Sequence, residues 1–258
     1  MAFPDALGRH WKGWVIGVVA ALLVLGVGGP FVYIYFVEGT PPPPLSLSTA
    51  AAPSGGTATT TSTVAGTGAV DPAASSSSGS PASGSAVDGT WNVSSGSTAG
   101  YRIKETLLGQ SNTAVGRTTA VTGSIVVSGA SVPTGSFSVD LTKVASDRSQ
   151  RDDQFQGRIM DTARFPTATF VLTSPIQFGA APAEGAQITA GAAGNLTMHG
   201  VTKPVAFQVT ATRNGGVIGV QGSVPIVFAD YGISNPSGGP ATTENNGVLE
   251  FLINLTHG

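Results

Sequence analysis

The chain has 258 residues, a formal net charge of −2 and no cysteine, and these facts exclude several classes of function. Without cysteine there are no disulfides, no thiolate metal sites and no cysteine nucleophile. The near-neutral charge removes the electrostatic basis of non-specific nucleic-acid binding, so no nucleic-acid partner is expected. Abundant glycine and sparse charge favour turn-rich β-structure over a helical bundle.

An uncharged, apolar run of 24 residues occupies positions 14–37. A helix that spans a bilayer needs roughly 20 such residues. A cleaved signal peptide is the alternative, but its apolar core would be shorter and an A-x-A-like cleavage site would follow closely. Arg9 and Lys12 precede the run and Glu38 follows it, so the positive-inside rule places residues 1–13 in the cytoplasm. We therefore expect a single-pass anchor in the cell membrane, with the rest of the chain extracytoplasmic.

Residues 38–88 are dominated by proline, serine, threonine, glycine and alanine, with four consecutive prolines at positions 41–44. So few large apolar residues cannot offset the entropy lost on ordering, and the sequence predicts a disordered linker. Fifty flexible residues have an r.m.s. reach of about 40 Å. Such a tether would let a folded domain stand off the membrane and swing back to it.

From Gly89 to the C-terminus, apolar and polar residues alternate as they do in strands with one buried face. The alternation is clearest over 136–142, 205–212 and 249–256, and shorter cases occur at 91–93, 101–103, 125–127 and 224–228. Clusters of glycine, proline, asparagine and serine separate these runs. About eight antiparallel strands in one domain, residues 89–258, predict an all-β barrel or sandwich.

A charged segment at residues 146–165 interrupts the strands. Arg148 and Asp152 are one helical turn apart, as are Phe155 and Ile159, so we predict a short amphipathic helix across the β-domain, ended by Pro166. Neighbouring Asp152 and Asp153 point about 100° apart on a helix, so salt bridges are expected of them and not joint acid–base work. The guanidinium of Arg151 either joins these salt bridges or binds a ligand headgroup.

The interior of an eight-stranded barrel is filled by side chains or holds one small ligand. The apolar rows contain many Val, Ile and Ala residues and few aromatics, a composition that suits a dry core and an elongated apolar cavity equally. The pattern leaves both possibilities open.

No catalytic, metal or cofactor site is predicted. His199 is the one histidine deep in the domain, but a catalytic base needs a nucleophile or an orienting carboxylate beside it, and the sequence supplies neither. There is no G-x-S-x-G motif and no cluster of His, Asp and Glu at the spacing of metal ligands. A turn or rim position is expected for His199.

The domain carries five motifs in order: T-W-N-V followed by Y-R-I at Thr90–Ile103, R-D at Arg151–Asp152, R-F-P-T-A-T-F at Arg164–Phe170, G-N-L-T-M-H-G-V-T-K-P-V at Gly194–Val205, and F-A-D-Y-G-I at Phe228–Ile233. Together they resemble the YceI-like family of lipid- and polyisoprenoid-binding proteins, in a membrane-anchored form. The chain departs from the common pattern of the family at two places. It has Phe228–Ala229 where a basic residue is usual, and it lacks a histidine near Ser97. Both departures concern headgroup preference more than the fold.

The resemblance implies a lipocalin-like, extended antiparallel β-barrel with a helix packed across it. It also implies an interior that binds a long isoprenoid chain, as in polyprenyl lipids and quinones, or another amphiphile. We therefore expect a non-enzymatic lipid-binding domain with no other cofactor. The candidate lipid-binding residues are Phe137, Val139, Arg151, Phe155, Ile159, Phe165, Phe170, His199, Phe207, Phe228 and Tyr231.

Two other functions stay open from the sequence. One is a structural or interaction module of the cell envelope, with a filled core and no ligand. The other is a hydrolase or isomerase that acts on an amphiphile inside a cavity.

Overall fold

The computed structural model describes residues 40–47, 87–238 and 241–258. The expected membrane span, residues 14–37, and most of the expected linker lie outside these ranges. In the described part of the chain, none of the helices combines the length and the apolar composition that crossing a bilayer requires.

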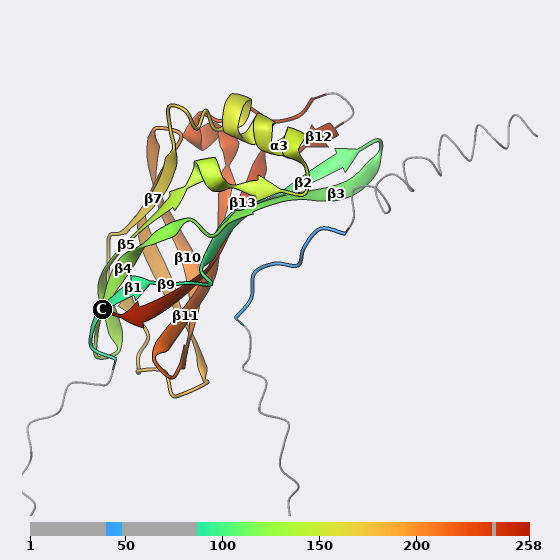
Figure 1. Ribbon diagram of the computed structural model, residues 1–258. Helices are drawn as coiled ribbons and strands as arrows, with labels where there is room; N and C mark the ends of the chain where they lie inside the picture. Colours follow the sequence, from blue (N-terminus) through green and yellow to red (C-terminus); the bar gives the residue numbers. More distant parts are fainter. Residues whose placement is uncertain (1–39, 48–86, 239–240) are drawn as a thin grey trace, which may run out of the picture.

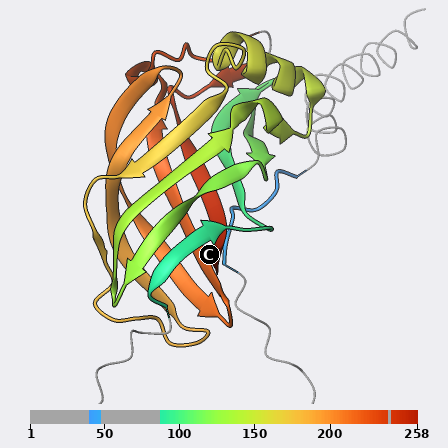
Figure 2. The same ribbon diagram turned by 60° about the vertical axis from the view of Figure 1, so that its left-hand side comes forward.

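The described residues form one antiparallel sheet of 13 strands. The strands are β1 (Gly89–Val93), β2 (Thr98–Leu107), β3 (Gln110–Thr118), β4 (Val121–Ser128), β5 (Ser131–Asp140), β6 (Ala145–Ser146), β7 (Thr167–Leu172), β8 (Ile176–Gln177), β9 (Gln187–Met198), β10 (Val201–Asn214), β11 (Val217–Val227), β12 (Ala241–Thr243) and β13 (Asn246–His257). Within this sheet β1, β4, β5, β7, β9, β10, β11 and β13 follow one another, and β1 pairs again with β13. This ring is an eight-stranded barrel (Figures 1 and 2), and its closure removes the free edges that an open sheet would have.

One long strand, β13, connects the barrel to a small extension. Its C-terminal part pairs with β1, where Leu255 lies opposite Val93, and its middle pairs with β2, where Leu252 lies opposite Thr98. The β1–β2 loop crosses β13 between these two regions, and the Ser97 hydroxyl accepts a hydrogen bond of 3.0 Å from the Asn254 amide. From there β2 pairs with β3 and β3 with β6, which lengthens the barrel wall on one side (Figure 1).

The predicted crossing helix is confirmed. It consists of α3 (Ser149–Gln154) and one turn of π-helix (Phe155–Ile159), and it lies over the end of the barrel beside β2 and β3 (Figure 2). Phe155 is buried and Ile159 packs against the same cluster of core residues. The apolar side of this short helix therefore faces the interior of the barrel. We refer to this end as the helix end.

Buried side chains form two clusters along the barrel axis. The cluster at the helix end includes Tyr101 and Met198, and the cluster at the opposite end includes Trp91 and Leu255. The Trp91 indole N–H donates a 2.8 Å hydrogen bond to the carbonyl of Val87, which is only 2% exposed. The folded part thus includes Val87, two residues before the predicted start of the domain.

The predicted strand runs coincide with strands of the sheet, and their apolar rows point inward. Val209 and Ala211 of β10 are buried, and so are Ile253 and Leu255 of β13. The alternation of apolar and polar residues did not single out β9, because the middle of this strand, residues 190–194, consists only of alanine and glycine.

Residues 40–47 differ from the prediction of a disordered linker. They run along the outside of the barrel (Figure 1), and their backbone groups bond to side chains of β2, β3, β11 and β13. The physical reason is that this segment meets buried and half-buried polar partners, which the composition of the linker by itself does not reveal.

Candidate functional site

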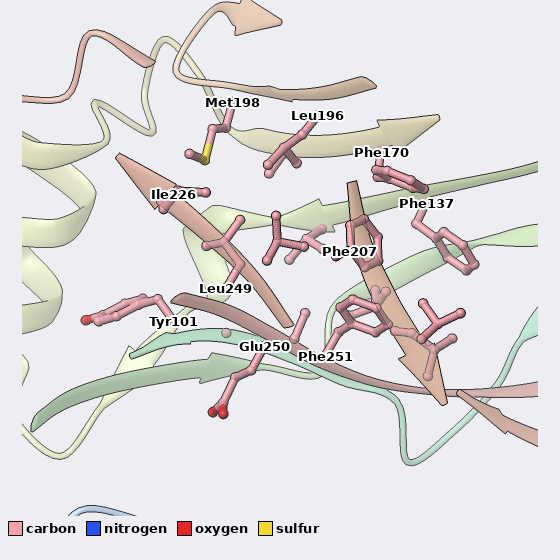
Figure 3. A pocket seen from close by; sticks show the side chains of 18 of the residues that line it. Tyr101, Phe137, Phe170, Leu196, Met198, Phe207, Ile226, Leu249, Glu250 and Phe251 are labelled. Atoms are coloured by element: carbon pink, nitrogen blue, oxygen red, sulfur yellow. The ribbon is translucent and has the colours of Figure 1, made fainter. Parts of the chain in front are cut away.

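The barrel encloses a cavity of about 520 Å³, within the range of about 300–1,000 Å³ that is typical of small-molecule sites. Its lining comes from every strand of the sheet except β1 and β6, from the helix and from several connecting segments. Figure 3 shows inward side chains around open space. The sequence left a filled core and a cavity equally open, and the structure contains a cavity.

Eight of the eleven predicted site residues line this cavity. They are Phe137 and Val139 of β5, Arg151 of α3, Phe155 and Ile159 of the π-helical turn, Phe170 of β7, Phe207 of β10, and Phe228, which follows β11. The alternation of inward residues places the four strand members, and the crossing helix places three more. Phe228 belongs to the short 3₁₀ helix that follows β11.

Three phenylalanine rings form a belt midway along the cavity. Phe207 meets Phe170 edge-on with 5.4 Å between ring centroids, and it meets Phe251 edge-on at 5.9 Å. Edge-to-face contacts at these distances are favourable beyond the area that they bury. Figure 3 shows all three rings on the same stretch of the wall.

Inward-facing glycines lie under two of these rings, those of Phe170 and Phe251, and under the ring of Tyr101. A Cβ atom added at Gly222 would lie 2.6 Å from the ring of Phe251, one added at Gly194 would lie 2.3 Å from the ring of Phe170, and one at Gly116 would lie 2.4 Å from that of Tyr101. These distances are far below van der Waals contact, so each ring occupies the space that a side chain on the neighbouring strand would need. The rings therefore lie against the wall, which leaves the middle of the barrel open.

The helix end of the cavity is polar. Arg148, Gln150, Arg151 and Gln154 contribute to its lining together with Glu105 of β2. The Arg151 guanidinium bonds to Glu105 at 3.2 Å and also to Asp147 one helical turn before it. The charge of Arg151 is therefore balanced by two carboxylates.

The opposite end of the cavity, the loop end, is uncharged. Its lining includes Gly129 and Ala130 of the β4–β5 turn and Ala180, Ala181 and Pro182 of the loop before β9. On β9 the lining runs from Ile188 to Met198, ten residues apart, which corresponds to about 33 Å of strand. The cavity is thus elongated, with one polar and one apolar end.

Tyr101 lies at the polar end, stacked on Phe155 with 5.1 Å between ring centroids and an interplanar angle of 15°. Burial of the phenol raises the pKa of Tyr101 well above its ordinary value, and the nearby Arg151 opposes that shift only in part. The hydroxyl therefore stays protonated at neutral pH.

Three predicted residues, Phe165, His199 and Tyr231, do not line the cavity. His199 and Gly200 form the two-residue turn between β9 and β10 with φ values of 51° and 75°, as a type I′ hairpin turn requires. His199 Nδ1 lies 3.0 Å from the Tyr231 carbonyl, and the Phe165 ring meets the imidazole edge-on at 4.9 Å.

Tyr231 is only 2% exposed, and its hydroxyl has no hydrogen-bond partner among the described residues. Burial raises the pKa of Tyr231, with a smaller contribution from Asp230. This corner packs the hairpin turn onto the segment after β11. Tyr231, a candidate lipid-binding residue, therefore packs in this corner and does not line the cavity.

Sequence reasoning missed other residues that line the cavity, among them Tyr101, Phe178, Leu196, Met198, Leu249 and Phe251. A signal existed for Leu249 and Phe251, because both belong to the alternating row of 249–256. For Leu196 and Met198 the signal was hidden in a strand rich in glycine and alanine. Among the described residues, no group of three or more His, Asp or Glu is placed to hold a metal ion.

Comparison with known families gives a match over most of the chain. The sequence profile of the YceI-like domain matches residues 69–255. A UPF0312 protein of Shewanella sp. (strain ANA-3) is 33% identical over 122 residues, which cover 45% of this chain and 59% of that protein. A UPF0312 protein of Pseudomonas putida is 33% identical over 109 residues, which cover 39% of this chain and 53% of that protein. The chain thus spans little more than half the length of these curated relatives.

A solved structure shares the fold. It is described as a polyisoprenoid binding domain from Saccharophagus degradans implicated in plant cell wall breakdown, and it superposes with a TM-score of 0.52 at 16% sequence identity. The superposition covers 66% of this chain and 98% of that domain. At this identity the likeness concerns the arrangement of the barrel and its helix.

Proposed function

The chain belongs to the YceI-like domain family, and on that premise we propose that its barrel binds one long apolar ligand, an isoprenoid-like lipid such as a polyprenyl lipid or a quinone. The observation that carries the proposal is the elongated cavity of about 520 Å³ between the strands. The description of the Saccharophagus degradans domain as polyisoprenoid binding supports the same ligand class for a barrel of this fold.

Partition of the apolar tail supplies the binding free energy. Each buried methylene group is worth about 0.8 kcal/mol, so ten of them contribute about 8 kcal/mol. That value corresponds to a dissociation constant of about 1 μM before the entropy of association is subtracted. A preformed cavity keeps the entropic cost low, because the wall does not have to reorganise.

The polarity of the two ends orients an amphiphile. The headgroup lies at the helix end beside Gln150, Arg151 and Gln154, and the tail runs toward the loop end. Since Glu105 and Asp147 already balance the charge of Arg151, a phosphate headgroup would have to compete with two carboxylates for it. We therefore expect a neutral headgroup that forms hydrogen bonds, such as a quinone ring.

The setting that we propose for this barrel is the outer face of a cell membrane. Residues 14–37 have the length and composition of a single-pass anchor, with residues 1–13 in the cytoplasm and the barrel extracytoplasmic. An anchored barrel would take a lipid out of the bilayer and hold its tail in the aqueous space beside the membrane.

The other two functions are less well supported. A module with a filled core does not fit an interior with room for a ligand. A hydrolase or isomerase needs a nucleophile and a base in the cavity, whereas His199 lies in a turn outside the lining. Mass spectrometry tests the enzymatic alternative directly, since a chemically altered ligand after prolonged incubation would support it.

Two neighbouring alanines of β9 provide a test. Ala192 is buried and lines the cavity, whereas the next residue, Ala193, is not part of the lining. In a polypeptide of residues 40–258 titrated with a long-chain quinone, Ala192→Phe should weaken binding at least tenfold, because its ring fills the lumen. Ala193→Phe, the matched control, should bind as the unmodified chain does. Equal binding by both variants, or no binding by a folded unmodified chain, would contradict the proposal.

A further inference from the structure

Residues 40–47 occupy a fixed position on the outside of the barrel. The Pro42 carbonyl accepts a 2.7 Å hydrogen bond from Arg102, and the Pro43 carbonyl accepts one from Arg117. Carbonyls of an extended proline run have no partners within their own segment, so they are available to arginine donors. The polyproline part of the segment is thus held by two charged side chains.

A buried carboxylate on the same wall completes this contact. Glu250 of β13 is only 4% exposed, and its Oε1 accepts hydrogen bonds of 2.9 and 2.7 Å from Arg117. Its other oxygen, Oε2, accepts the backbone N–H of Leu45 at 3.3 Å. One oxygen of Glu250 therefore binds the barrel and the other binds the segment.

Gly219, which has no side chain, makes room for Leu47. Gly219 of β11 is buried, and a Cβ atom added there would lie 2.8 Å from Leu47 Cδ2. The Leu47 N–H donates to the side chain of Gln221, two residues further along β11. Leu45 and Leu47 are half-buried and Ser46 between them is exposed, as expected of a strand with one face on a surface.

The segment begins at the helix end of the barrel. Thr40, Pro41 and Pro42 share a groove of about 150 Å³ with Asn112 of β3 and with Asp147, which directly precedes the helix. From there the chain runs along the wall toward β11, where it reaches Leu47 (Figure 1). Its N-terminal residue is thus beside the polar end of the cavity.

We propose that residues 40–47 are a strap that fixes the helix end of the barrel, and with it the polar mouth of the cavity, toward the membrane. This inference rests on the membrane anchor proposed above. If the span ends at Val37, the three peptide steps to Thr40 cover at most about 11 Å. That distance is far shorter than the reach of about 40 Å expected for a free linker of fifty residues.

The remaining linker residues, 48–86, then close a loop between the strap and the barrel. Docking within one chain is favoured by a high effective concentration, which adds to the contacts described above. A barrel held in this way takes up an amphiphile from the bilayer with its headgroup end nearest to the surface. A freely tethered barrel would present both ends.

The test uses the full chain in lipid nanodiscs that contain nitroxide-labelled lipid as a fluorescence quencher. The chain has no cysteine, so Asp153→Cys and Gly216→Cys each carry one fluorophore, at the helix end and in the β10–β11 turn at the other end. The strap predicts at least threefold stronger quenching at position 153 than at position 216. Equal quenching, or a chain that does not associate with the discs, overturns the proposal.

Proline substitutions in the strap supply the matched variants. Leu45→Pro combined with Leu47→Pro removes the two N–H groups that bind Glu250 and Gln221 and should bring the quenching ratio close to one. Ser46→Pro, which alters an exposed residue between them, should keep the ratio. Gly219→Val acts from the barrel side by filling the space of the Leu47 side chain, and it should have the effect of the double variant. Unchanged ratios in these variants contradict the strap.

Ligand uptake separates this proposal from the function on which it builds. The strap variants should still bind the quinone in solution, because none of their substitutions touches the cavity lining. If uptake fails while the quenching ratio is high, the proposed ligand is wrong and the strap stands. If uptake succeeds while the ratio equals one, the strap is wrong.

Discussion

At the scale of single residues, the feature that decides whether this barrel holds a ligand is the pairing of inward glycines with aromatic rings. Gly222 lies directly opposite Phe251 in the β11–β13 register, and Gly116 lies opposite Tyr101 in the β2–β3 register. A phenyl ring takes up several times the volume of a methylene group. Placing the ring over a glycine gives the wall its apolar surface without filling the lumen.

Adding a single methyl group should therefore close part of the cavity. In Gly222→Ala the new Cβ would clash with the ring of Phe251, and we expect the ring to turn into the lumen. Displacing about two methylene groups of ligand corresponds to about 1.6 kcal/mol, or a roughly tenfold weaker affinity. Titration with the long-chain quinone measures this change.

The control for this substitution is Gly191→Ala on β9, where the nearest neighbour of an added Cβ is the flexible end of Gln208 at 3.8 Å. It should leave affinity unchanged. Combining Gly222→Ala with Phe251→Leu removes the clash and should restore much of the binding. If Gly222→Ala binds the ligand as tightly as the unmodified chain, the role assigned to the glycines is wrong.

The raised pKa of Tyr101 leads to a prediction about how the free energy of unfolding depends on pH. Its pKa is raised above the ordinary value of 10.0, mainly by burial, so the folded state holds the phenolic proton more tightly than the unfolded state. The resulting stability is fully present below pH 10 and is lost as the pH rises above it. The free energy of unfolding should therefore fall above pH 10 relative to Tyr101→Phe, which keeps the ring on Phe155. Parallel curves for the two proteins up to pH 11 would show that burial of the hydroxyl has no such effect.

At the scale of elements, the short helix is the part of the barrel whose position depends most on charge. Arg151 joins α3 to β2 through Glu105, whose side chain is 9% exposed, and Glu105 also accepts a 2.9 Å hydrogen bond from Asn112. Six α-helical residues and one π-helical turn are too few to be stable alone. Their position therefore depends on these contacts and on the burial of Phe155.

Removing the guanidinium should loosen the helix end. Arg151→Ala leaves the carboxylate of Glu105 largely buried without its cation, and we expect a loss of about 1–3 kcal/mol in the free energy of unfolding. Urea denaturation measures the loss, and amide exchange of residues 149–159 locates it. Arg158→Ala, which removes an exposed side chain, should stay within about 0.5 kcal/mol. Equal stability of the two variants would rule out a structural role for the Arg151–Glu105 pair.

The elements also show what the sequence could and could not predict. The rows through Phe207 and Leu249 identified β10 and β13, and the charged segment with Phe155 and Ile159 identified the helix, because both rest on local periodicity. Glu105 as the partner of Arg151 was beyond reach, since the two are 46 positions apart and only the closed sheet brings them together. Periodicity did not reveal β9, because alanine and glycine give a weak periodic signal; only its end, within the motif Gly194–Val205, was indicated by the family resemblance.

The same limit, that local periodicity does not reveal contacts between distant segments, applied to the site. The sequence indicated that the side chains of four residues point inward, and these residues line the cavity: Phe137, Val139, Phe170 and Phe207. Whether the rings fill the interior or lie against its wall depends on the register of neighbouring strands, which no single segment contains. His199 lies in a turn, as expected, and Phe165 and Tyr231 pack around that turn, so none of these three candidate residues lines the cavity.

At the scale of the whole molecule, the barrel, the helix and residues 40–47 make the two ends of the cavity different from each other. The polar end lies under α3 and beside the start of the strap, and the uncharged end lies among the loops before β5 and β9. A lipid bound as proposed would have a defined orientation, with its tail shielded from water along about 33 Å of strand. A dry barrel built from the same strands would have no need for polar residues at one end of its interior.

Native mass spectrometry of residues 40–258, prepared free of lipid and mixed with a long-chain quinone, measures directly whether the cavity takes up a ligand. A cavity that binds an apolar chain predicts the mass of one polypeptide plus one unaltered ligand, and it predicts that Ala192→Phe carries little or none under the same conditions. A correctly folded chain that shows only its own mass at saturating ligand would contradict the central claim that the barrel holds an apolar chain in its interior.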